Sequence, residues 1–129
     1  MNFYFSKKVT NQNFEEAIEN VTEALKVEGF GILTVIDVKE TFKKRLDVDF
    51  KKYIILGACN PLFAHKALLQ EEKAGVFLPC NVIIVEQENG DVEVSAVDPV
   101  ASFSPVTNKN VEIIAIEIQQ KLKSVIESL

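Results

Sequence analysis

The sequence has no tryptophan, a single histidine and only two cysteines among its 129 residues. No apolar run approaches the roughly 20 residues that a membrane-spanning helix needs. The N-terminus also lacks the apolar stretch and small-residue cleavage site of a secretory signal. So few cysteines without an export signal are typical of reduced thiols rather than of a disulfide framework. We therefore expect a cytoplasmic protein that makes no use of a membrane.

Several motifs of common enzymes are missing as well: the glycine-rich phosphate loop, the Gly-x-Ser-x-Gly nucleophile elbow and the His-Glu-x-x-His zinc pair. The net charge is −5 and the isoelectric point is near 4.9. Such a chain is unsuited to nucleic acids or anionic membranes, which attract positive surfaces. One basic cluster, Lys43-Lys44-Arg45 with Lys51 and Lys52, has acidic neighbours. We interpret this cluster as solvated surface.

What is present is enough for one hydrophobic core. The length fits a single domain over residues 1–129, and 47% hydrophobic and 26% charged residues are ordinary values for globular proteins. The apolar spacing predicts strands at 3–9, 30–37, 53–58, 82–87 and 92–97, and helices at 13–29, 38–46, 60–72 and 108–129. This order predicts the α+β class, with a mostly antiparallel sheet, two long helices on one face and short helices between the central strands.

Helix ends are marked clearly in the sequence. Asn13 followed by Glu16 resembles a capping box, Gly29 suits a left-handed helix end, and Asn108 suits a cap of the last helix. Two apolar stripes at helical spacing follow these caps: Phe14, Ile18, Val21 and Leu25 in the first, and Val111, Ile114, Ile118 and Leu122 in the last. Both stripes are predicted to pack on the same face of the sheet.

Asn89-Gly90 is the signature of a two-residue hairpin turn. With such a turn Glu86 would face Glu93, and Val85 would face Val94. The core-facing set would then be Ile83, Val85, Val92, Val94 and Ala96. An apolar patch would remain on the outer face, made of Val82, Ile84 and Val97. Because an exposed apolar patch often marks a subunit contact, it predicts a homodimer.

The reactive side chains gather between residues 57 and 82. Cys59 ends a predicted strand just before a helix N-terminus, which is an environment that lowers a thiol pKa. His65 follows in the second turn of that helix, and Cys80 opens the next strand. If the two strands are neighbours, we expect Cys59, His65 and Cys80 to converge at one end of the sheet.

Three interpretations of this cluster remain open. Cys59, His65 and Cys80 provide the ligand count of a metal site with one open position, which suits a transition metal such as zinc. Cys59 with His65 could instead form a thiol-dependent redox or catalytic pair. Finally, both cysteines could be buried structural residues.

The function expected from the residues is a small-ligand or metal-binding module, with enzymatic activity left open. The candidate ligand-binding residues are Cys59, Asn60, His65, Cys80, Asn81 and Asp98. The thiol-dependent redox protein or enzyme is the alternative. Asn60 has a second reading as a helix cap, and Asp98 as the end of a strand.

Four motifs of this chain resemble a known family. They read EGFGILTVIDVK (28–39), YIILGACNP with AHKAL (53–68), GVFLPCNV (75–82) and SAVDP (95–99). In this order they resemble the bacterial and archaeal family named domain of unknown function 302, over essentially the whole chain. The resemblance implies a β-α-β(4)-α fold of the TATA-binding-protein-like type. It implies no biochemical role, since a fold alone does not assign one.

Overall fold

The computed structural model of the protein describes residues 2–129. Its elements are β1 (Tyr4–Val9), α1 (Phe14–Val27), β2 (Gly31–Asp37), α2 (Val38–Leu46), β3 (Tyr53–Cys59), α3 (Pro61–Gln70), a 3₁₀ helix η1 (Glu72–Phe77), β4 (Cys80–Glu86), β5 (Val92–Val97), α4 (Pro99–Ser102) and α5 (Lys109–Ser128). Across residues 2–129, no helix combines the length and the apolar character that crossing a membrane requires.

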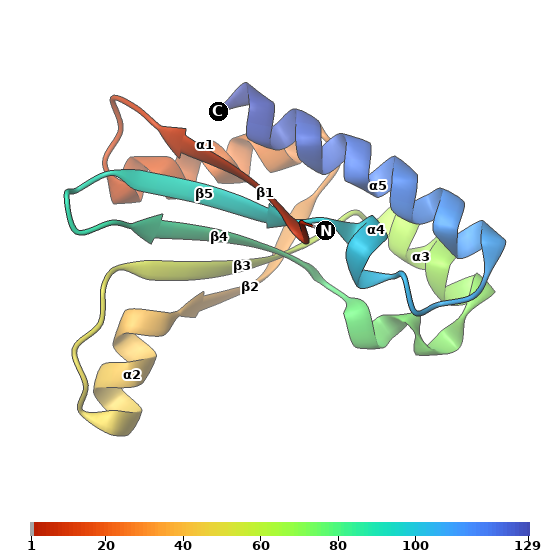
Figure 1. Ribbon diagram of the computed structural model, residues 1–129, viewed down its shortest axis with the longest axis horizontal. Helices are drawn as coiled ribbons and strands as arrows, with labels where there is room; N and C mark the ends of the chain where they lie inside the picture. Colours follow the sequence, from red (N-terminus) through yellow and green to blue (C-terminus); the bar gives the residue numbers. More distant parts are fainter. Residues whose placement is uncertain (1) are drawn as a thin grey trace.

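The five strands form one sheet in the order β1-β5-β4-β3-β2, and every neighbouring pair is antiparallel. Helices α1 and α5 lie together on one side of this sheet (Figure 1). The α+β class, the single sheet and the placement of both long helices are therefore confirmed. The element order agrees with β-α-β(4)-α, while the TATA-binding-protein-like type stays a prediction.

The main core lies between α1, α5 and the inner face of the sheet. Side chains at alternate strand positions meet the helical stripes, because a strand projects its residues to opposite faces in turn. The fully buried members include Leu25, Val21, Leu56, Val82, Ile84, Val94 and Leu122. Burial of each large aliphatic side chain contributes about 1.5–3 kcal/mol, so this layer is the main source of stability.

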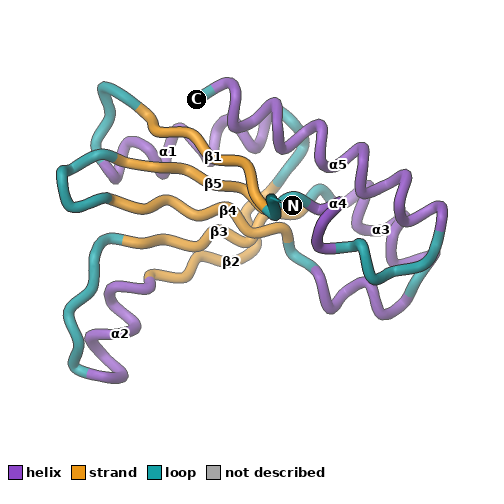
Figure 2. The backbone as a smooth tube through the Cα atoms, in the orientation of Figure 1, coloured by secondary structure: helices purple, strands orange, loops and turns teal. Residues whose placement is uncertain are grey.

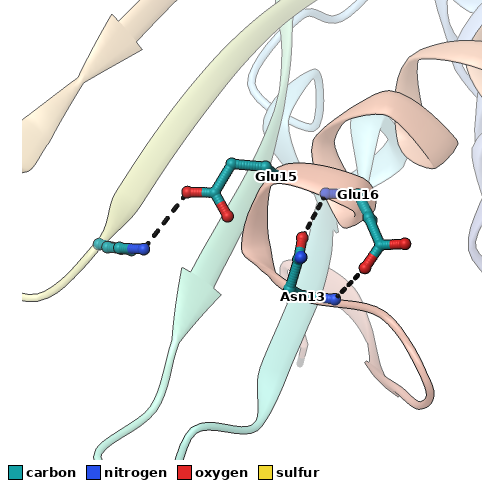
Figure 3. Close-up of polar contacts among 4 residues, drawn as sticks. Asn13, Glu15 and Glu16 are labelled. Atoms are coloured by element: carbon teal, nitrogen blue, oxygen red, sulfur yellow. Dashed lines mark hydrogen bonds and ion pairs between the residues drawn. The ribbon is translucent and has the colours of Figure 1, made fainter.

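Helix α1 begins with the capping box that the sequence predicts. The side chain of Asn13 accepts a hydrogen bond of 2.8 Å from the N–H of Glu16, and the Glu16 carboxylate accepts one of 3.0 Å from the N–H of Asn13 (Figure 3). The carboxylate of Glu15 lies 3.3 Å from Nζ of Lys52. At the other end Gly29 has φ +87°, the left-handed conformation expected there.

The hairpin between β4 and β5 differs from the prediction by one residue. Val85 pairs with Glu93 and Glu86 pairs with Val92, so the loop has three residues, 88–90, instead of two. Gly90 has φ +90°, which suits the last residue of a three-residue loop built on a type I turn. The Asn89 side chain accepts a hydrogen bond from the N–H of Asp91, which favours this longer loop.

This shift exchanges the two faces of β4, because a one-residue slip moves every side chain to the opposite face. Val82 and Ile84 are 0% exposed in the core, and Ile83 lies on the outer face instead. The prediction is therefore wrong for Val82 and Ile84, whereas Val97 does lie on the outer face. The three residues do not form one patch, so the predicted homodimer loses that support.

Helix α2 extends from the β2 edge of the sheet and buries none of its residues (Figure 2). Phe42 packs edge-on against Phe50, with ring centroids 5.1 Å apart. Leu46, the last residue of this helix, is 65% exposed.

Replacing Asn13 with alanine should lower the free energy of unfolding by about 1 kcal/mol, because the N–H of Glu16 loses its acceptor. Urea denaturation followed by circular dichroism measures this change. The matched control is Glu19→Ala, at an exposed position of the same helix. Equal effects of the two substitutions would contradict a stabilising role for the cap.

Candidate functional site

The two cysteines lie on neighbouring strands but not side by side. Ala58 pairs with Cys80, so Cys59 occupies the next row of the β3–β4 ladder. Residues in consecutive rows project to opposite faces of a sheet. Cys80 is accordingly buried in the core beneath the helices, whereas Cys59 is half-buried towards the outer face. Both are free thiols.

Neither cysteine has the electrostatic environment of an activated thiolate. Burial raises the pKa of Cys59, which is opposite to the lowering expected from the adjacent helix N-terminus. Burial, and secondarily the negative charge of a Cys59 thiolate, raises the pKa of Cys80 to about 11. Both side chains are therefore protonated at neutral pH, because an apolar environment disfavours the charged form.

His65 lies on α3 and is exposed. Phe63 and Ala67 are the buried residues of this helix, so the intervening His65 projects from its opposite side. Throughout residues 2–129, no three or more His, Cys, Asp and Glu side chains are grouped so that they could hold a metal ion. The structure thus does not form the three-residue metal site predicted from Cys59, His65 and Cys80.

Asn60 and Asp98 have structural contacts. Asn60 occupies the N-cap position of α3 without making a side-chain cap, and its amide donates a hydrogen bond of 3.2 Å to the carbonyl of Glu28. The Asp98 carboxylate caps α4 by accepting from the N–H of Val100, and it also accepts from Nε2 of Gln119, each at 3.0 Å. A ligand-binding role for either residue stays a prediction.

Gly57 explains the close packing beside Cys59. A Cβ atom at Gly57 would overlap Oγ1 of Thr34 on β2 and would lie 2.8 Å from Cγ of Pro79. Pro79 follows a cis Leu78–Pro79 peptide bond just before β4. The missing side chain therefore lets Thr34 and Pro79 approach β3 closely, and this contact closes one end of the outer sheet face.

The outer face itself presents three cross-strand rows. The register aligns Tyr4–Val97–Asn81 in the first row, Ser6–Ser95–Ile83–Ile55 in the second and Lys8–Glu93–Val85–Tyr53 in the third. These positions alternate along each strand with those of the main core, so they share the face opposite α1 and α5. The rows bring together residues that are up to 93 positions apart in the chain.

A cleft of about 480 Å³ lies over these rows. Its lining comprises Phe3, Tyr4, Tyr53, Asn81, Ile83, Glu93, Ser95, Ala96 and Val97. The hydroxyls of Ser6 and Ser95 share a hydrogen bond of 2.6 Å in the middle row. Aromatic rings from β1 and β3 thus stand on opposite sides of a mostly apolar centre, with an amide, a hydroxyl and a carboxylate distributed around it.

Of the residues predicted to bind a ligand, only Asn81 lines this cleft. The other predicted residues stand out in the sequence because of their polar or reactive side chains. The cleft consists mainly of strand residues without such side chains. Tyr53 and Ser95 each open one of the motifs that resemble the family, but neither has a reactive side chain that marks it as a binding residue. A correct β4–β5 register would have placed Ile83 beside Ser95 and revealed the outer row.

Comparison with known proteins identifies a family model and similar solved structures. The family model described as domain of unknown function DUF302 matches residues 5–129. Among solved structures, the chain is similar to the crystal structure of an uncharacterized conserved DUF302 protein from Bacillus stearothermophilus. The two share 30% sequence identity over 98% of each chain, with a TM-score of 0.90. No curated protein matches the chain.

The thiols should react slowly with iodoacetamide at pH 7, because a raised pKa leaves little thiolate. Labelling of the Cys59→Ser variant, which isolates Cys80, should accelerate as the pH rises well above neutrality, because burial alone still raises the pKa of Cys80. The Cys80→Ser variant, which isolates Cys59, should label faster since Cys59 is the less buried thiol. Mass spectrometry measures both rates, and urea-unfolded protein gives the reference rate. Fast labelling of native Cys59 at pH 6 would contradict this assignment.

Proposed function

The chain belongs to the DUF302 family, a domain of unknown function, and from the geometry of its cleft we propose that it is a module that binds a small, largely apolar molecule on the outer face of the sheet. The single observation that carries this proposal is the cleft between Tyr4 and Tyr53, which spans four strands. The proposed site differs from the Cys59 region to which the sequence directed attention.

The size of the cleft supports this proposal. Pockets for small molecules typically measure about 300–1,000 Å³ and are lined mainly by apolar and aromatic side chains. The cleft of about 480 Å³ lies within that range. Ile83 and Val97 supply apolar area on the outer face, and the strands that carry them hold them in place.

The aromatic side chains support a flat or cyclic ligand. Phe3 is 67% exposed and Tyr4 is 43% exposed, so both large aromatic side chains are accessible to a ligand. Their rings meet edge to face, with centroids 5.0 Å apart. Tyr53 lies on the other side of the cleft. An aromatic pair contributes about 0.5–1.5 kcal/mol beyond the free energy gained by burying its surface area. A ligand ring that lies between Tyr4 and Tyr53 would therefore bind favourably.

The polar groups of the cleft support a ligand that donates hydrogen bonds. Asn81 offers an amide, Ser95 a hydroxyl and Glu93 a carboxylate. A carboxylate accepts hydrogen bonds only, and beside aromatic faces it favours a positively charged donor. We therefore propose a ligand with an apolar ring and an amine or hydroxyl group.

The thiol-dependent alternative has weaker support. Thiol chemistry requires an accessible thiolate with a base beside it. Burial raises the pKa of Cys59, and His65 projects from the far side of α3. The half-buried Cys59 does not line the cleft.

Replacing Tyr53 with alanine should weaken binding of Nile red, an uncharged aromatic dye, by roughly tenfold, or about 1.4 kcal/mol. The reason is that one aromatic side of the cleft is removed while its floor stays in place. Fluorescence titration measures the dissociation constant. Leu69→Ala is the matched control, because Leu69 is 71% exposed on α3 and lies outside the cleft.

A second variant, Glu93→Gln, tests the contribution of the polar groups of the cleft. Ligand-observed NMR with aromatic amine fragments should show weaker binding to Glu93→Gln than to the wild-type protein, while uncharged aromatic fragments bind both equally. Dye binding that is unchanged in Tyr53→Ala and reduced in Leu69→Ala would refute the proposed site.

A further inference from the structure

We propose that a second copy of this chain docks at the β2 edge of the sheet, with the two β2 strands antiparallel and each α2 against the end of α1 in the other copy. This surface lies on the opposite edge of the sheet from β1. It is independent of the ligand cleft and of the wrongly predicted patch on the hairpin.

The first observation is the edge strand itself. β2 pairs with β3 on one side and has no strand on its other side in the described chain. Its Leu33, Val35 and Ile36 are 65%, 63% and 46% exposed. Natural proteins blunt such edges with lysine, proline or bulges, because unpaired backbone groups invite another strand.

A bulge at Leu33 interrupts the first half of β2, but the stretch from Thr34 to Asp37 is regular. This stretch contains neither lysine nor proline. The regular half therefore keeps unpaired backbone groups available, and a two-fold axis through it would match the strand with itself in antiparallel orientation.

The second observation is α2, which follows β2 without a linker and buries none of its residues. At the end of α2, Leu46 is 65% exposed, and Val48 just beyond it is 48% exposed. In an antiparallel pair, the end of one β2 lies beside the start of the other. Each α2 is thereby placed beside the end of α1 in the second copy, where Val27 is 81% exposed.

The third observation is charge. Residues 38–52 carry six Lys or Arg and three Asp or Glu, so the rest of the chain carries eight basic and sixteen acidic side chains. Residues 23–28, which form the end of α1 where the contact is proposed, contain two glutamates and one lysine. The basic α2 segment and the acidic α1 segment are thus complementary, and the two-fold arrangement brings them together twice. Complementary charges favour the correct partner and its orientation.

Sedimentation velocity at tens of micromolar should give a species of twice 14.4 kDa. Val35→Lys places a charge on the edge and should weaken this dimer by at least roughly tenfold. Leu69→Lys is the matched control, because it puts the same charge at a comparably exposed position on α3. Circular dichroism shows whether each variant is folded. Hydrogen exchange of residues 34–37 should slow as protein concentration rises.

A charge exchange tests the orientation of the two copies. Arg45→Glu alone and Glu23→Lys alone should each dimerise less, since each puts like charges at both α2–α1 contacts. An equimolar mixture of the two variants should form a heterodimer at wild-type strength, because both contacts are then oppositely charged. A monomer of 14.4 kDa for the wild-type chain, or a dimer insensitive to Val35→Lys, would overturn the proposal. An unrestored mixture would overturn the α2–α1 contact.

Discussion

The sheet carries apolar side chains on both faces, and the chain provides long helices for only one of them. Val82 and Ile84 of β4 are buried beneath α1 and α5, whereas Ile83 between them projects to the other side. The helices thereby determine which strand residues make the core and which remain available. The cleft and the aromatic rings that line it follow from this one-sided cover, because they lie on the face that α1 and α5 leave uncovered.

The local features of the fold were the most predictable from the sequence. Asn13, Gly29 and Asn108 have the positions expected of them, because caps depend on the chemistry of a few adjacent residues. The hairpin was not predictable to the same accuracy. Asn89-Gly90 fits both a two-residue and a three-residue loop, and the choice between them depends on how β4 and β5 pack beyond the turn.

The candidate site was less predictable, for a different reason. Cys59, His65 and Cys80 attract attention by their chemistry, but the direction of a side chain depends on strand row and helix face. Its strand row places Cys80 in the core, and its helix face exposes His65 to solvent. The cleft consists of residues such as Tyr4, Tyr53 and Ser95, which gain significance only from the register that aligns them. A pattern within one strand contains no information about its neighbours, so this site emerges only at the level of the sheet.

The three-residue loop at 88–90 has a consequence for how this chain can evolve. One face of β4 carries Val82 and Ile84, and the other carries Ile83 and Val85. The two faces are almost equally hydrophobic, so the hydrophobicity of β4 hardly distinguishes one register from the other. The loop length, together with Glu93 and Ser95 on β5, makes that choice. Substitutions within the loop leave the register intact, provided that a residue able to adopt positive φ occupies position 90. Deletion of one residue of this loop would move every β4 side chain to the opposite face of the sheet, and Ile83 would no longer line the cleft. An insertion or deletion at this turn would therefore change more of the sheet than the exposed position of the turn suggests.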